Sequence, residues 1–195
     1  MQAWMLLRHS FVMLFGNFAM ALRLSAVLYA VQAIPNIYFL NFMSGVSDAE
    51  LGSSPQFWLF GSFNMVILMI TGFWVAVVWH RFILSEEIPS GYIPKFHGRR
   101  MMAYFGQILL LGLLIGVLLT GLETILMFQF DNLSETLTDI IFFGFIVLIG
   151  SVFLRFAAIL PAAALGDWLG WGGAWRATKG SMGSLMLVSL VLWGA

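Results

Sequence analysis

Residues 154–180 read LRFAAILPAAALGDWLGWGGAWRATKG, and our interpretation of the whole chain starts from this stretch. An apolar segment carries Arg155 near its end and then meets a proline. The chain continues through a turn rich in Gly and Trp, which holds Arg176 and Lys179, before a new apolar segment begins. This order of apolar, basic and apolar segments predicts a helical hairpin in a membrane, with its turn on the basic side.

A looser version of the same layout lies earlier in the chain. Residues 79–89 read WHRFILSEEIP, and a loop with two arginines at 98–102 leads into the next apolar segment. Arg81 and Arg155 are each followed by Phe. Two hairpins in one orientation would form a parallel repeat of the kind that some transport folds use. Alternatively, the sorting of positive charge to one side alone places an Arg at each inner helix end.

The composition excludes a soluble globular domain. Of the 195 residues, 61% are hydrophobic and 9% are charged, and the mean hydropathy is +0.96. A water-facing surface calls for roughly a quarter of charged residues. Long apolar runs without alternation favour helices over a transmembrane barrel. The sequence therefore predicts an all-α, polytopic transmembrane helical bundle.

We predict one transmembrane domain over residues 1–195. Its first segment, 1–20, has a bulky apolar stripe typical of an amphipathic helix in the membrane interface, although it could also extend the first span. The predicted spans cover about 21–43, 57–79, 103–128, 140–165 and 181–195. The last is incomplete, because about 20 residues are needed to cross the hydrocarbon core. We therefore expect the protein to continue beyond this sequence.

The charges are segregated along the chain. Three segments, the N-terminal one and those at 80–102 and 154–180, hold all the cations: Arg8, Arg23, Arg81, Lys95, Arg99, Arg100, Arg155, Arg176 and Lys179. The two opposite loops and their flanks hold only acids: Asp48, Glu50, Glu123, Asp131, Glu135 and Asp139. The positive-inside rule predicts a cytoplasmic N-terminus and cytoplasmic basic loops. We expect the bacterial inner (cytoplasmic) membrane.

A resemblance to a known family rests on four short motifs: Arg155–Phe156, Leu160–Pro161, Gly173–Arg176 and Thr178–Gly180. They resemble a signature of a bacterial multi-pass family that includes YciC-like proteins and the membrane domain fused to some glycerophosphodiester phosphodiesterases. The resemblance implies a helical membrane fold. Where that family often has an acid after the proline, this chain is neutral until Asp167. The phosphodiesterase domain is absent, so the resemblance implies no activity.

No motif points to catalysis or to a metal. The chain contains neither G-x-S-x-G nor H-E-x-x-H, and it has no cysteine. The spacing of His9, His80 and His97 matches no ligand pattern. We therefore predict no catalytic residue, no metal and no cofactor. A lipid-modifying enzyme would need His97, Glu86 and Glu87 to cluster at the interface.

Three sets of residues are candidates for other roles. Five basic residues form a basic rim that could bind lipid head groups, and the alternative is that the positive-inside rule alone explains their position: Lys95, Arg99, Arg100, Arg176 and Lys179. Three polar residues inside the predicted spans could form part of an ion or proton pathway, although the long Arg155 side chain could instead extend to the membrane interface: Arg155, Asn36 and Asn64. Small residues spaced by four could support helix packing: Gly112, Gly116, Ala158 and Ala162.

The hypothesis we favour from sequence is a non-enzymatic accessory or scaffold subunit. Its partners would be membrane lipids and other membrane protein subunits, with no nucleic acid. The alternative is a small transporter or permease-like component, with a polar cavity near Pro35, Asn36, Asn64 and Arg155.

Overall fold

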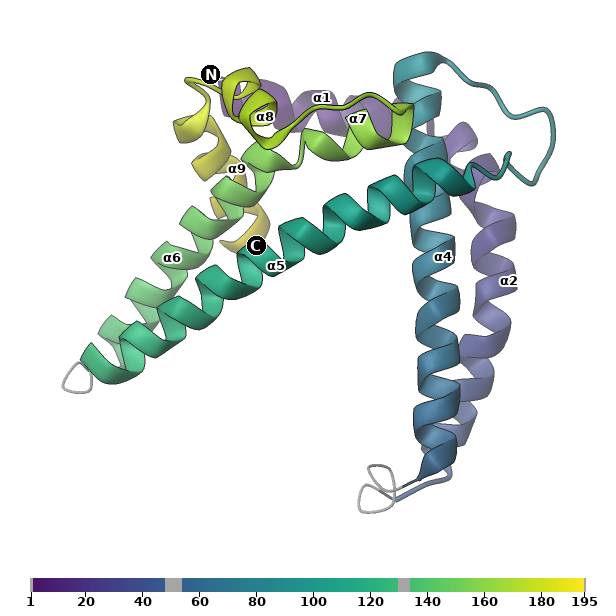
Figure 1. The fold of residues 1–195 in the computed structure, drawn as a ribbon, viewed down its shortest axis with the longest axis horizontal. Helices are drawn as coiled ribbons and strands as arrows, with labels where there is room; N and C mark the ends of the chain where they lie inside the picture. The colour runs from purple at the N-terminus through teal and green to yellow at the C-terminus, as the bar shows by residue number, and fades with distance from the viewer. Residues whose placement is uncertain (1, 48–53, 130–133, 195) are drawn as a thin grey trace. The chain divides into compact units, whose positions relative to one another are not determined.

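The computed structural model describes residues 2–47, 54–129 and 134–194, and none of them lies in a strand (Figure 1). The prediction of an all-α fold is confirmed. The helices are α1 Gln2–Gly16, α2 Phe18–Ser44, α4 Pro55–Ser85, α5 Gly98–Gln129, α6 Glu135–Phe156, α7 Ile159–Leu165, α8 Trp171–Ala177 and α9 Met182–Gly194.

Four helical segments are long and apolar enough to cross a membrane: Phe18–Ser44, Pro55–Ser85, Gly98–Ile125 and Thr136–Leu165. The shortest has 27 residues, and at about 1.5 Å per residue it exceeds the roughly 30 Å hydrocarbon core. Between 11% and 17% of each apolar window is buried inside the structure, so most of these residues are partly or fully exposed. By helix length and composition, the chain is a multi-pass membrane protein.

The helix boundaries differ from the predicted ones by a few residues. The N-terminal helix ends at Gly16, and α2 begins after Asn17, whose φ of −115° and ψ of 24° interrupt the helix. At its start, α4 is capped by the Ser54 hydroxyl, which accepts a hydrogen bond from the Phe57 N–H. Three of the acids that the sequence places in the two loops opposite the basic ones lie outside the described residues: Asp48, Glu50 and Asp131.

The chain divides into two compact units, Asn17–Met101 and Met1–Gly16 with Met102–Ala195. We describe each unit by itself. The prediction of a single domain stays a prediction.

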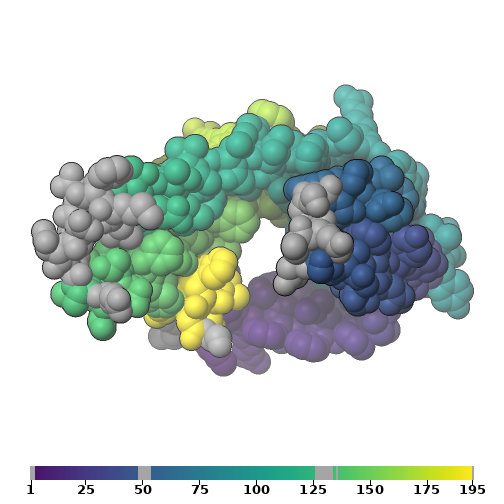
Figure 2. All heavy atoms as spheres, turned by 90° about the horizontal axis from the view of Figure 1, so that it is seen from below, coloured from purple at the N-terminus to yellow at the C-terminus, as the bar shows by residue number. Residues whose placement is uncertain are grey.

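In the unit Asn17–Met101, α2 and α4 lie side by side (Figures 1 and 2). Aromatic rings join them: Tyr38 and Phe42 both meet Phe60 edge-to-face, at centroid distances of 5.3 and 5.5 Å. Gly61 admits the Phe39 ring, which lies 3.5 Å from the position that a Cβ would take. This unit is thus held together by aromatic packing along one helix pair.

In the other unit, α6 packs against α9, and α1 also contacts α9 (Figure 2). Small residues allow the close approach of α6 and α9. Ser151 and Ser189 are 0% and 1% exposed. A Cβ added at Gly150 would overlap the Ser189 Oγ and lie 3.0 Å from Trp193 Nε1. The backbones therefore approach through small side chains, as membrane helices commonly do.

The predicted span at 140–165 contains a break. The helix α6 ends at Phe156 and α7 begins at Ile159. Pro161 has no N–H and its ring clashes with the carbonyl four residues earlier, so a continuous helix is disfavoured. The Ala157 carbonyl accepts instead from the Leu160 N–H at 3.0 Å. Gly166, with φ of 90°, then ends α7 in the left-handed conformation that glycine adopts without strain.

We predict that Gly150→Val destabilises the α6–α9 pair by about 1–3 kcal/mol, because the added side chain overpacks a closed interface. Thermal unfolding of the protein in detergent micelles, followed by circular dichroism, measures the loss. Gly144→Val is the matched control, since no described atom lies within 4 Å of a Cβ at this position of the same helix. Equal stability of the two variants would contradict the packing described.

Candidate functional site

Two polar centres occur in the described residues, one in each unit. The first surrounds Arg155, in the last turn of α6. This side chain is 7% exposed. Its Nε donates to Thr178 Oγ1 at 3.0 Å, and one terminal nitrogen donates to the Trp175 carbonyl at 3.1 Å. A cation thus meets the carbonyl end of the short helix α8, where the partial charge is negative.

Aromatic rings close this centre. The guanidinium carbon of Arg155 lies 3.4 Å from the centroid of the Trp175 ring, a cation–π contact. The neighbouring Phe156 meets Trp171 at 4.9 Å and Trp175 at 5.8 Å. The Thr178 hydroxyl in turn donates to the Ala174 carbonyl at 2.8 Å. Together these contacts hold α8 against the end of α6.

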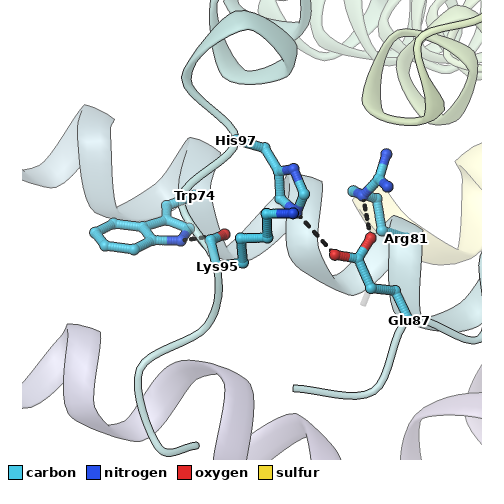
Figure 3. A network of polar contacts seen from close by, with 5 residues as sticks. All are labelled: Trp74, Arg81, Glu87, Lys95 and His97. Atoms are coloured by element: carbon cyan, nitrogen blue, oxygen red, sulfur yellow. Dashed lines mark hydrogen bonds and ion pairs between the residues drawn. The ribbon is translucent and has the colours of Figure 1, made fainter. Parts of the chain in front are cut away.

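The second centre lies between α4 and the loop that connects α4 to α5 (Figure 3). Arg81 Nε forms an ion pair with one oxygen of Glu87, and His97 Nε2 lies 3.0 Å from the other. The Trp74 indole N–H donates to the Lys95 carbonyl at 3.3 Å. The loop is therefore fixed to α4 at two separate points.

The electrostatics of this centre favour the charged form of Glu87. Partial burial alone raises the pKa of this carboxyl, but hydrogen bonds and charge from Arg81 and His97 lower it by more. The net pKa lies below the ordinary value of 4.5. Glu87 is therefore a carboxylate at neutral pH and orders the two basic side chains around it.

The structure brings together only part of the cluster that a lipid-modifying enzyme would need. His97 and Glu87 are in contact. Glu86 is exposed and ends α4 with a positive φ of 53°. Within residues 2–47, 54–129 and 134–194, no three His, Asp or Glu side chains gather in a way that could hold a metal ion.

The basic residues predicted to bind lipid are mostly at the surface. Lys95, Arg99, Arg176 and Lys179 are exposed, and Arg100 is half-buried. Lys95 belongs to the second centre through its carbonyl. Glu87 was expected only beside His97 in a lipid-modifying enzyme, and its ion pair with Arg81 was not predicted from the sequence. Their opposite charges six residues apart, across a helix end, were the available signal.

The intramembrane polar residues pair locally. Asn64 Nδ2 donates to Asn36 Oδ1 at 3.4 Å. The cavity beside Pro35, about 520 Å³, is lined by apolar side chains: Val31, Ile34, Pro35, Tyr38, Phe60, Phe63 and Ile67. Arg155 belongs to the other unit and binds α8 there. The polar cavity that the transporter alternative predicts beside Pro35 is thus apolar in the described residues.

The small-residue pairs differ in their surroundings. Gly112 and Gly116 are exposed, and no described atom lies within 4 Å of a Cβ at either position. Ala158 and Ala162 are half-buried, and the buried residues are their neighbours Ile159, Leu160, Ala163 and Ala164. The glycine pair of α5 therefore packs on nothing in the described part of the chain.

A comparison of the chain with protein-family models, with curated proteins and with solved structures finds no match in any of the three.

We predict that Arg155→Met destabilises the protein by about 2 kcal/mol, because two charge-assisted hydrogen bonds and one cation–π contact are lost. Tryptic cleavage after Lys179 should accelerate as α8 detaches from α6. Arg176→Met, which changes an exposed arginine of α8, is the matched control and should leave this cleavage rate unchanged. Equal rates in the two variants would show that Arg155 does not hold α8.

We also predict a pH dependence for Glu87. Because its pKa is lowered in the folded protein, its stabilising contribution is present above the ordinary pKa of 4.5 and is lost as the pH falls through the folded value. Glu87→Gln should lower stability by about 1 kcal/mol or less at pH 7. In acid, the melting temperature of Glu87→Gln should approach that of the wild type, because the Glu87 carboxyl is then protonated and its stabilising charge is lost. Glu86→Gln, at the exposed neighbour, should match the wild type throughout, and a pH-independent deficit in Glu87→Gln would argue against this electrostatic role.

Proposed function

We propose that this chain is a non-enzymatic accessory or scaffold subunit of a larger complex in the bacterial inner membrane. The observation that carries the proposal is the open glycine face of α5. Gly112 and Gly116 lie one helical turn apart in a candidate span, and no described atom covers either position. Exposed glycine weakens a helix, and two of them on one face suit close approach by another helix.

The placement of the N-terminus and basic loops in the cytoplasm is part of the same proposal. It rests on the distribution of Lys and Arg in the sequence, which the positive-inside rule assigns to the cytoplasmic side. The resemblance to YciC-like proteins supports a bacterial multi-pass membrane protein of this layout. Lipids and other membrane subunits are the proposed partners.

The transporter alternative has less support. The cavity beside Pro35 has apolar walls, and Asn36 and Asn64 bind each other. A conduction path would need polar groups that face a shared wet cavity. We therefore favour the accessory role.

The test is purification of the tagged, full-length protein from its own membranes in mild detergent, followed by native mass spectrometry. We expect a partner subunit in fixed stoichiometry, and the double variant Gly112→Ile/Gly116→Ile should lose it, because side chains then block close helix approach. Gly121→Ile is the matched control: this glycine is also open, on the same helix, but faces about half a turn away. A lone wild-type protein, or equal partner loss in both variants, would contradict the proposal.

A further inference from the structure

A cavity lies inside the unit Asn17–Met101, between the end of α4 and the loop at 87–97 that follows it. Its volume is about 280 Å³. Its lining combines charged and apolar residues: Val78, Arg81, Glu87, Ile88, Pro89, Ser90, Ile93, Pro94, Lys95 and His97. This is the same loop that the polar centre of Figure 3 fixes to α4.

The charge of the lining is positive. Arg81 and Lys95 are permanent cations, and Glu87 is the one carboxylate among these lining residues. Glu87 contacts both Arg81 and His97. The exposed Lys95 adds a second cation, and Ser90 adds a hydroxyl donor. The cavity is therefore suited to an anion that accepts several hydrogen bonds.

The other walls of the cavity are apolar and reach the surface. Ile88 and Ile93 are 66% and 64% exposed, and the adjacent Tyr92 is 77% exposed. Exposed aliphatic and aromatic side chains in a short loop at a helix end are typical of the membrane interface. A free inorganic anion would not need these walls. The glycerol and first methylenes of a lipid would cover them.

We propose that this cavity binds a phosphate group, presented by an anionic phospholipid whose glycerol backbone rests on Ile88 and Ile93. The inference rests on the proposed membrane placement and names the lipid chemistry that the accessory protein recognises. Lys95 and Ser90 contact the phosphate. Glu87 holds Arg81 and His97 in position and does not itself contact the ligand.

The test is a titration of the detergent-purified full chain with dioctanoyl phosphatidylglycerol, with bound lipid counted by native mass spectrometry. We expect one saturable site, and Lys95→Gln should weaken binding about fivefold, the size of one near-surface cation. Lys95→Arg should retain binding, because the charge is kept. Arg8→Gln is the matched control, since it removes an exposed cation of the other unit that belongs to no candidate lipid site, and it should change affinity less than twofold.

Two further arms identify the source of the phosphate. Dioctanoylglycerol has the same acyl chains without phosphate and should not occupy the site. Inorganic phosphate in excess should displace the lipid only weakly. If inorganic phosphate binds as tightly as the lipid, the site takes a soluble phosphate and the lipid assignment is overturned. If dioctanoylglycerol binds equally well, or if Lys95→Gln and Arg8→Gln lose affinity equally, there is no phosphate site. These measurements need no protein partner, so failure of the α5 interface leaves them unaffected.

Discussion

The hydrocarbon core of a membrane offers no hydrogen bonds to a free carbonyl, so each helix end near it needs a partner from the protein. At the interruption before Pro161, the Ala157 carbonyl accepts from the Leu160 N–H, and the end of the short helix α8 lies in the same unit. There Arg155 donates to the Trp175 carbonyl and to Thr178, and Trp175 covers the guanidinium. The break, the short helix α8 and the buried arginine therefore form one arrangement, since a buried cation without these acceptors would be costly.

In the other unit, the arginine near a helix end has a different kind of partner. Arg81 lies close to the end of α4, as Arg155 lies close to the end of α6, but its partner is the carboxylate of Glu87. In both cases the arginine at the end of one helix fixes the segment that follows it. This correspondence extends the repeat that the sequence suggests. It also differs at the chemical level, because one arginine binds a backbone carbonyl and the other binds an acid.

The sequence predicted the helices because long apolar runs and charge segregation are local signals. It also singled out Arg155, Trp175 and Thr178, although their contacts join residues about twenty positions apart and depend on how the turn folds. The short helix α8 was expected as a turn, because Gly172 and Gly173 are weak helix formers. The ion pair of Arg81 with Glu87 was missed, because the path of the loop at 86–97 has no periodic signal.

The central claim is that four segments cross the membrane and that both basic loops lie on the same side of it. The chain contains no cysteine, so single cysteines report accessibility without background. The side chains of Gln56, Tyr92 and Trp168 are all exposed, so a cysteine at each position can react with a maleimide. In intact cells, a membrane-impermeant maleimide should label Gln56→Cys and should not label Tyr92→Cys or Trp168→Cys. After lysis, it should label all three variants. Labelling of Tyr92→Cys or Trp168→Cys in intact cells, or protection of Gln56→Cys, would contradict the account.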